Sequence, residues 1–246
     1  MAAPHVQGDR LGLVVGSALA AGTLADDATQ RIDVTTEWGD APVLDIGPAI
    51  VLARHGLDAF TPAHRVDHHR NVAVLCAAGC DRVVGLASVG GLRSWPIGTV
   101  VAPFDFFAPS ANPTFHEDAL GHSVPGFDEP WRDLVIETWR DTTDTPLMDG
   151  GVYAQTWGPR FETPAEVRML ADHADIVGMT VASECILTRE AGLAYAVVAV
   201  IDNLANGIAG EQLALADYHA NAATNHARLV GDLQHVLPRL AEVPRP

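Results

Sequence analysis

The chain carries short apolar runs along its whole length, with turn residues between them. The runs are Leu11–Val15, Ala49–Leu52, Val83–Leu86, Thr99–Ala102, Gly151–Gln155, Ile176–Met179 and Tyr195–Ile201. Each is too short for a helix of its own, and several are rich in Val and Ile, so they predict buried strands. A chain with this pattern is expected to build a central sheet and to cover it with the segments between the runs.

Helical patterns fill those intervening segments. A helix should begin after Thr163 and run to about Ala174, because Thr at the N-cap, Pro164 at N1 and Glu166 at N3 form a start signal. The alternation predicts an α/β fold in a single domain over residues 1–246, with a central mixed β-sheet flanked by helices. The other helix candidates are Arg70–Ala78, Glu129–Arg140, Ser183–Ala191 and the Ala- and Leu-rich stretch Gly210–Leu240, interrupted only by Pro238.

Charge and cysteine content narrow the class of protein. With 15 basic residues against 31 acidic ones, the net charge of -16 opposes binding to nucleic acid or to an anionic membrane. Cys76, Cys80 and Cys185 are too few for a disulfide framework and lack the second pair that a zinc site needs, so reduced thiols are expected. The apolar stretch Leu11–Ala25 is too short to span a membrane and makes a poor signal peptide, which favours a strand, then a loop, in a cytoplasmic protein.

Polar and glycine-bearing segments follow several of the predicted strands. In α/β sheets, ligands bind where loops gather at the carboxyl ends of the strands, so these segments are expected to meet at one site. They are Gly16-Ser17, Arg54-His55-Gly56, Ala87–Gly91, Gly158–Glu162, Gly178–Thr180 and Asp202-Asn203.

Arg54-His55 places a fixed cation beside a titratable group in an acidic chain. Arginine binds phosphate through two parallel N–H groups, although the alternative is a surface salt bridge. His64, His68 and His69 could suggest a metal site, but no Glu stands between the first two as in the zinc protease motif. A solvated cluster is the better interpretation, and no metal is assigned.

Two glycine-containing loops have shapes that suit a ligand. In Ala87–Gly91, Ser88 is not the nucleophile of a hydrolase elbow, because Leu86 stands where that motif needs Gly. This loop is either a tight turn or a set of backbone N–H groups facing an anion. In Gly158–Thr163, the ring of Phe161 could stack on a flat heterocycle while Glu162 accepts a hydrogen bond from a ring N–H.

From Tyr153 to Ile208 the chain resembles the trimeric purine nucleoside phosphorylases and the related methylthioadenosine phosphorylases. The matching text is YAQTWGPRFETPAEVRML, ADIVGMT and SECILTREAGLAYAVVAVIDNLANGI, with weaker similarity through VVGS, VLARHG, ASVGGL and VAPFDFF. The resemblance implies phosphorolysis of a purine nucleoside to free purine and ribose 1-phosphate. It also implies a homotrimer that uses inorganic phosphate as co-substrate and needs no cofactor or metal.

The same resemblance assigns roles residue by residue. It implies Asn203, Glu162 and His55 as catalytic groups. Met179 would pack under the ribose, Phe161 would lie against the purine, and His122 would approach the sugar of a neighbouring subunit. Gly90 and Leu215 would also touch the substrate. Phosphate would be held by Ser17, Arg54, His55, the Ser88 backbone N–H and Thr180.

The predicted base follows from two of these side chains. Glu162 can accept the N1–H of a 6-oxopurine, and the Asn203 amide can serve O6 and N7, which favours inosine- or guanosine-like nucleosides. A mismatched buried polar edge costs about 1–3 kcal/mol. A slip of one residue would instead place Asp202 at the base and favour adenine. Leu215 is apolar where relatives carry His, which would suit a 5′-methylthio sugar.

Three other activities therefore stay open. The first is phosphorolysis of 5′-methylthioadenosine or 5′-methylthioinosine. The second is nucleoside binding without catalysis, and the third is a nucleosidase that uses water and releases free ribose.

Overall fold

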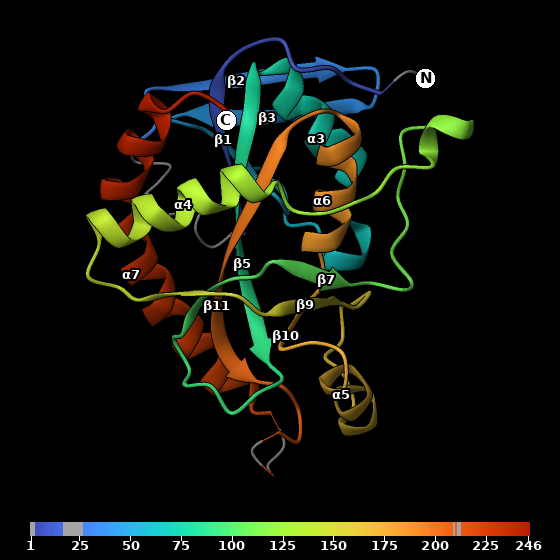
Figure 1. Cartoon of the computed structure of the whole chain (residues 1–246), viewed down its shortest axis with the longest axis vertical. Coiled ribbons are helices and arrows are strands. Elements are labelled where there is room, and N and C mark those ends of the chain that lie inside the picture. Colours follow the sequence, from blue (N-terminus) through green and yellow to red (C-terminus); the bar gives the residue numbers. More distant parts are fainter. Residues whose placement is uncertain (1–2, 17–26, 209, 211–212) are drawn as a thin grey trace.

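The computed structural model describes residues 3–16, 27–208, 210 and 213–246, and its strands join in one mixed sheet flanked by helices (Figure 1). The α/β prediction is confirmed. The strands are β1 (Arg10–Val15), β2 (Gln30–Thr36), β3 (Gly39–Asp45), β4 (Ile50–Ala53), β5 (Cys80–Gly91), β6 (Val100–Ala102), β7 (Asp105–Phe107), β8 (Leu147–Asp149), β9 (Val152–Gln155), β10 (Ile176–Gly178) and β11 (Ala194–Leu204). The helices are α3 (His68–Ala77), α4 (Glu129–Thr142), α5 (Pro164–Ala171), α6 (Val181–Glu190) and α7 (Leu215–Glu242), with 3-10 turns at Ala63–Arg65 and Ala119–Gly121.

Strand β5, 12 residues long, is the strand at which the sheet branches. It pairs in parallel with β1 and β11, and its last two residues pair antiparallel with β10. From β1 the sheet continues through β4 and β3 to β2, from β10 through β9 to β7, and from β11 through β6 to β8. The branching brings the ends of β5, β10 and β11 together in one region of the molecule (Figure 1).

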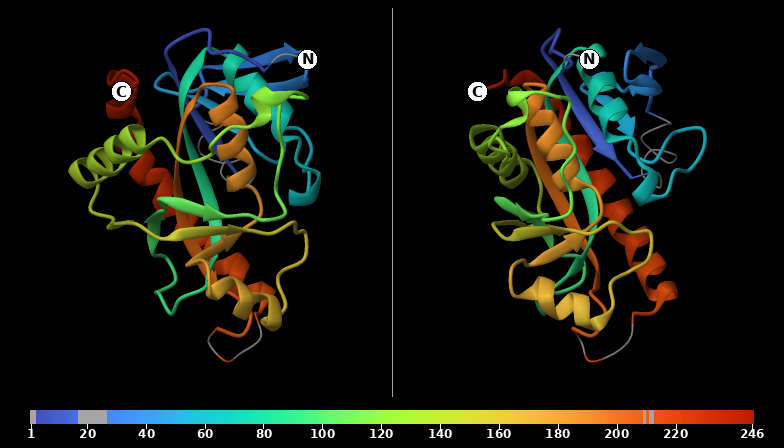
Figure 2. Two further views of the ribbon diagram at one scale, coloured as in Figure 1. Left: turned by 45° about the vertical axis from the view of Figure 1, so that its right-hand side comes forward. Right: turned by 90° about the vertical axis from the view of Figure 1, so that its right-hand side faces the viewer.

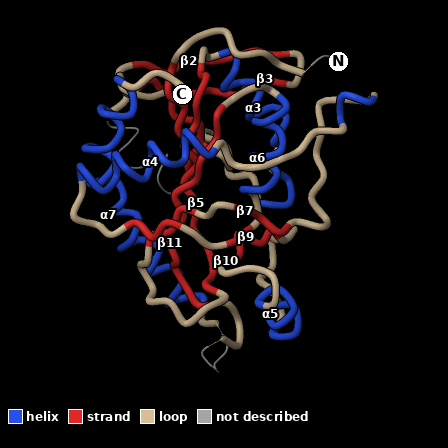
Figure 3. Tube along the Cα trace, in the orientation of Figure 1, coloured by secondary structure: helices blue, strands red, loops and turns tan. Residues whose placement is uncertain are grey.

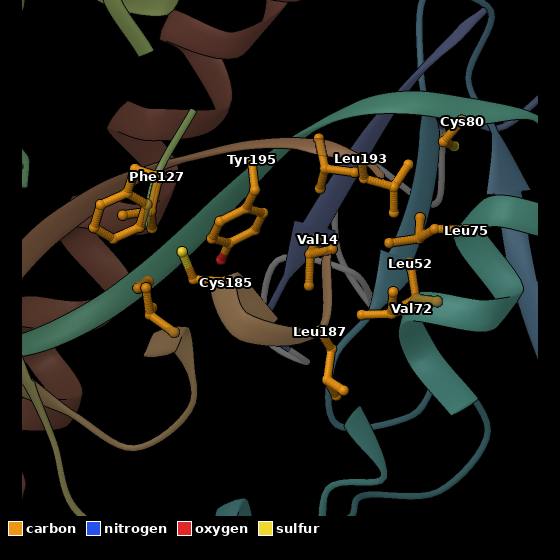
Figure 4. Packing of buried hydrophobic residues seen from close by; sticks show 14 of the residues in the cluster. Val14, Leu52, Val72, Leu75, Cys80, Phe127, Cys185, Leu187, Leu193 and Tyr195 are labelled. Atoms are coloured by element: carbon orange, nitrogen blue, oxygen red, sulfur yellow. The ribbon is translucent and has the colours of Figure 1, made fainter. Parts of the chain in front are cut away.

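Helices cover the sheet on two sides, as Figure 3 shows by colour. One core cluster joins Leu11, Leu13 and Val15 of β1 to apolar side chains of α4 and α7. A second joins Val14 to side chains of α3 and α6 (Figure 4). Both faces of β1 are thus covered, which is why it reads as an uninterrupted apolar run. Burying each large apolar side chain contributes about 1.5–3 kcal/mol.

The hairpin of β2 and β3 was not foreseen from the apolar runs. Its two strands pair antiparallel along their whole length, and exposed and partly buried residues alternate along β2. A strand with one solvated face has no continuous apolar run, although the alternation around Ile32 and Val34 carries the period of two. Glu37 and Trp38 form the turn between the strands, and Gly39, which follows as the first residue of β3, has the positive φ of 115° that favours glycine.

Two of the predicted helices have wrong boundaries. α7 begins at Leu215 rather than near Gly210. It also continues through Pro238 to Glu242 without interruption, and buried Leu237 and Leu240 on either side of the proline hold this last part against the core. α5 ends at Ala171 rather than near Ala174, because the next amides turn back to the Leu170 carbonyl. Although α7 has 28 residues, no helix among the described residues is long and apolar enough to cross a bilayer.

The N-terminal strand and the cysteines follow the sequence expectations where they can be seen. β1 occupies the predicted strand, and residues 17–26, into which its loop would run, lie outside the described residues. Cys76, Cys80 and Cys185 are buried free thiols. Burial raises the pKa of both Cys76 and Cys80 to about 12, so neither is a reactive thiolate.

Candidate functional site

A cavity of about 660 Å³ lies where β5, β10 and β11 end, beside the N-terminal half of α7. Figure 2 shows α7 running alongside β5 and β11. The cavity brings together segments that are far apart in the sequence, as the strand-end pattern predicts. The predicted site residues that line it are Arg54, His55, Ser88, Gly90, Phe161, Glu162, Met179, Thr180 and Asn203.

Arg54 stands at one end of the cavity, directly after β4, and is only 3% exposed. Its Nε and Nη2 donate to the carboxylate of Glu184 on α6, and its Nη1 donates to the Leu86 carbonyl at 2.8 Å. Glu184 also accepts a hydrogen bond from the Tyr195 hydroxyl at 2.7 Å. A guanidinium has five N–H groups, and the two left over have no acceptor among the described residues. Arg54 therefore presents a fixed cation to the cavity.

The charges of Arg54 and Glu184 stabilise each other. Burial alone would raise the pKa of Glu184, but the Arg54 charge and its hydrogen bonds outweigh burial and hold that pKa below its ordinary value. Burial alone would likewise lower the pKa of Arg54, and Glu184 reverses the effect. Both groups are charged at neutral pH. Arg54 was predicted from the sequence as a site residue, but Glu184 was not, because the two residues are 130 positions apart.

His55 lies beside Arg54 and is held by the chain that follows it. Its Nδ1 is 2.8 Å from the Thr61 carbonyl, which can only accept, so Nδ1 carries a proton. Burial, followed by the Arg54 charge, lowers the pKa of His55, so the ring is neutral at pH 7. Nε2 is then an acceptor, which suits a protonated oxygen of an anion at this end.

Thr180, Ser88 and Ser17 complete the predicted set of phosphate ligands. Thr180 lines the cavity as the N-cap of α6, where the partial positive charge of a helix N-terminus favours an anion. The Ser88 hydroxyl donates to Asp202, so an anion would meet the Ser88 backbone rather than its side chain. Ser17 lies outside the described residues, although its neighbour Gly16 lines the cavity.

The other end of the cavity carries an aromatic ring and two hydrogen-bonding side chains. Phe161 meets Tyr218 of α7 edge to face, with ring centroids 5.5 Å apart. Glu162, 7% exposed, accepts a hydrogen bond from Thr156 Oγ1 at 2.5 Å. The Asn203 amide nitrogen donates to the Leu204 carbonyl at 2.9 Å, and a Cβ at Gly90 would stand 3.3 Å from that nitrogen. A flat heterocycle could lie against Phe161 with its polar edge toward Glu162 and Asn203.

A bulge in β11 decides which of two neighbouring residues faces this cavity. The pairing with β5 shifts between Ile201 and Asn203, so Asp202 has no partner in the ladder. Asn203 lines the cavity. Asp202 is 0% exposed and turned away, accepting hydrogen bonds from Ser88 Oγ and from Asn225 Nδ2, the latter at 2.7 Å. The arrangement gives no support to a slip that would place Asp202 at the base.

The structure does not bring Leu215 or His122 into the cavity. Leu215 begins α7 and is 57% exposed, and His122 lies on an exposed loop with its Nδ1 3.1 Å from the Ala119 carbonyl. The lining from α7 comes instead from Tyr218, His219, Ala222, Ala223, His226 and Leu229. His219 and His226 were not predicted as site residues, although their separation of seven residues places them on one face of a helix.

Comparisons with known proteins show the family of the chain. The family model described as "Phosphorylase superfamily" matches residues 10–237. A protein of Archaeoglobus fulgidus named "Probable 6-oxopurine nucleoside phosphorylase" is 37% identical over 210 residues, which cover 82% of this chain and 85% of that protein. A protein of Xanthomonas campestris pv. campestris named "Probable S-methyl-5'-thioinosine phosphorylase" is 36% identical over 227 residues, which cover 84% of this chain and 90% of that protein.

A solved structure shares the fold at low identity. Methylthioadenosine phosphorylase from Schistosoma mansoni in complex with adenine aligns with a TM-score of 0.81 and 21% identity. The alignment covers 96% of this chain and 92% of that one. At this identity the likeness concerns the architecture, and the chemistry must be argued from the cavity itself.

Proposed function

Because the chain belongs to the phosphorylase superfamily and is a purine nucleoside phosphorylase, we propose that its substrates are 6-oxopurine nucleosides such as inosine and guanosine. The observation that carries this proposal is the joint presence of Glu162 and Asn203 beside Phe161 in the cavity. A carboxylate only accepts hydrogen bonds, so Glu162 suits the N1–H of a 6-oxopurine. Adenine has an unprotonated N1 that would face Glu162 unpaired, at a cost of about 1–3 kcal/mol.

The opposite end of the cavity supports inorganic phosphate as the attacking group. Arg54 offers a fixed cation, His55 an acceptor for a phosphate proton, and Thr180 a hydroxyl at a helix N-terminus. Phosphate held there would form a bond to C1′ of the ribose while the C1′–N9 bond on the other face breaks. The protein then contributes position and electrostatics rather than a nucleophile of its own.

The departing purine takes the electron pair of the broken C1′–N9 bond. Asn203 can stabilise that charge, because its amide group has a second N–H beyond the one given to Leu204 and can donate it to N7. Glu162, held by Thr156, would keep the ring in the orientation that presents N7 to Asn203.

The sugar end separates the two leading substrates. Tyr218 and His219 on α7 line the cavity and can bond a 5′-hydroxyl, which favours an unmodified nucleoside. The second candidate is a 5′-methylthioinosine phosphorylase, favoured by the apolar lining from Ala222, Ala223 and Leu229. The relatives' names include both activities.

The decisive experiment supplies phosphate with inosine, guanosine, adenosine, 5′-methylthioadenosine and 5′-methylthioinosine in turn, and identifies the released base and sugar. We expect hypoxanthine and guanine with ribose 1-phosphate, and a preference for inosine over its methylthio form. Release of adenine alone would refute the 6-oxopurine proposal. Base release that ignores phosphate and yields free ribose would indicate a nucleosidase, and no release with any substrate would indicate a binding protein.

Three broader predictions accompany the proposal. Residues 1–246 would form one catalytic domain, and the enzyme would be a cytoplasmic homotrimer.

His122 lies on an exposed loop that also carries Leu120 and Val124, which are 68% and 84% exposed. Two large apolar side chains in solvent suit a subunit contact, where His122 could reach a neighbouring site.

A further inference from the structure

Helix α6 begins at the cavity with a threonine that does not cap it. Thr180 is the N-cap residue, and in the described part of the chain its hydroxyl makes no hydrogen bond. A threonine at this position normally accepts from an amide of the first turn. Thr163 does so at the start of α5, where the Glu166 amide donates to its hydroxyl at 3.3 Å. The two N-caps share a residue type and differ in what the hydroxyl does.

Side chains of β9 supply the missing cap of α6. The Tyr153 hydroxyl oxygen accepts from the amides of Thr180 and Val181, at 3.2 and 3.4 Å. Gln155, two residues along the same face of β9, accepts from the Ser183 amide at 3.0 Å and donates to the Ser183 hydroxyl at 2.6 Å. These contacts satisfy amides that would otherwise lack a partner at the helix start.

The backbone leaves room for this arrangement. β9 and β10 run in parallel with Gly178 beside Gln155, and a Cβ at Gly178 would come within 2.4 Å of the Tyr153 hydroxyl oxygen. Any side chain at position 178 would therefore push the phenol away from α6. Gln155 is 8% exposed and does not line this cavity, so it can act on a ligand there only through another residue.

We propose that Gln155 is a positioning residue for phosphate: by accepting the Ser183 amide, the N3 amide that the hydroxyl of an N-cap threonine normally binds, it leaves the Thr180 hydroxyl to bind the phosphate. This inference rests on the proposed function, which places phosphate at this end of the cavity. Arg54 gives independent support for an anion there, because its buried guanidinium lines the same cavity with N–H groups to spare.

The test is a double-mutant cycle of Gln155→Leu and Thr180→Val, read from the KM for phosphate. Gln155→Leu keeps a side chain of similar size and removes the acceptor, so the Thr180 hydroxyl should turn to the free Ser183 amide. The KM for phosphate should rise roughly 10- to 100-fold, the loss of one hydrogen bond to a charged group, with little change in the KM for inosine. Thr180→Val should have a similar effect, and the double variant should be no worse than either single one.

Tyr153→Phe is the matched control, because it removes an acceptor from the start of the same helix without freeing the Ser183 amide. It should lower thermal stability and leave the KM for phosphate unchanged. Multiplicative effects of Gln155→Leu and Thr180→Val would overturn the proposal, as would an equal loss of phosphate binding in Tyr153→Phe. Either would mean that Gln155 acts only on the stability of α6.

A direct binding measurement separates this inference from the proposed function. The shift of the melting temperature on adding inorganic phosphate alone gives the dissociation constant without turnover. Phosphate binding without base release would refute the proposed reaction, and the cycle read from these constants would still support or overturn the role of Gln155. If phosphate does not shift the melting temperature of the unaltered protein, the positioning role is overturned.

Discussion

Two buried carboxylates stand behind the lining of the cavity, and their hydrogen bonds are satisfied in different ways. Glu184, 3% exposed, is held by the Arg54 guanidinium and the Tyr195 hydroxyl. Asp202, 0% exposed, is held by the Ser88 hydroxyl and the Asn225 amide. Its one ionisable neighbour in the described residues is His226, with Nε2 3.8 Å from the carboxylate. One site has a permanent counter-charge, and the other depends on neutral donors.

The difference shows how an acidic chain can still prepare a site for an anion. Glu184 accepts hydrogen bonds from only some of the N–H groups of Arg54. The guanidinium is therefore fixed in place and still offers donors to phosphate. Asp202 instead ties β5, β11 and α7 together near the base, where no added charge is needed. Removing one partner of a buried ion pair leaves an uncompensated charge, whereas neutral donors can be replaced at lower cost.

The largest effect should come from Glu184→Gln. The change keeps the side-chain shape and leaves the Arg54 charge buried without its partner, so the free energy of unfolding should fall by about 3–5 kcal/mol. The KM for phosphate should also rise, because the guanidinium loses the group that orients it. Urea unfolding and steady-state kinetics measure the two effects.

Asp58→Asn is the control for that experiment. Asp58 pairs with Arg31 in an exposed ion pair, so its removal should leave stability close to that of the unaltered protein. If Glu184→Gln is equally mild, the buried pair is not the support of Arg54 that the geometry indicates.

The second largest effect should come from low pH, which should destabilise the protein around Glu184 through the protonation of His68. Burial lowers the pKa of His68 from 6.5 to about 4; the Glu184 charge acts in the opposite direction and is outweighed, and the Arg54 charge adds to the lowering. Below pH 6.5 the unfolded chain therefore binds a proton that the folded chain excludes, so stability falls as the pH drops from 6.5 to 4. At 1.36 kcal/mol per unit, the loss amounts to about 3 kcal/mol.

His68→Gln should remove that part of the acid sensitivity in urea unfolding measured from pH 7 to pH 4. Some slope should persist, because burial also lowers the pKa of His55 and of His226. The exposed His64, changed to Gln, is the control and should keep the full slope. An unchanged slope in His68→Gln would contradict the assignment.

The smallest effect is expected from Asp202→Asn. The amide keeps one acceptor and loses the other, so the free energy of unfolding should fall by about 1–3 kcal/mol. The KM for inosine should rise more than the KM for phosphate, since Asp202 adjoins Asn203 at the base. A loss as large as that of Glu184→Gln would mean that a protonated His226 supplies a counter-charge, and the contrast between the two carboxylates would fail.

Much of the fold could be predicted from local patterns. The apolar runs became strands because both faces of the sheet are covered, and Thr163, Pro164 and Glu166 start α5 as their order predicts. The β2–β3 hairpin escaped the same reasoning because one of its faces is solvated. At the site, Arg54, His55 and Phe161 could be named in advance, since each follows a strand or precedes a capped helix.

The sequence by itself determined the reaction class and the residue types at the two ends of the cavity, because these lie in short ordered segments. Only the tertiary structure decided which neighbours those residues have. The bulge in β11 turned Asn203 toward the cavity and Asp202 away from it. Glu184 met Arg54 across 130 residues, and Tyr153 reached the start of α6 across 27. Such contacts depend on strand register and on the packing of distant elements, which no local spacing encodes.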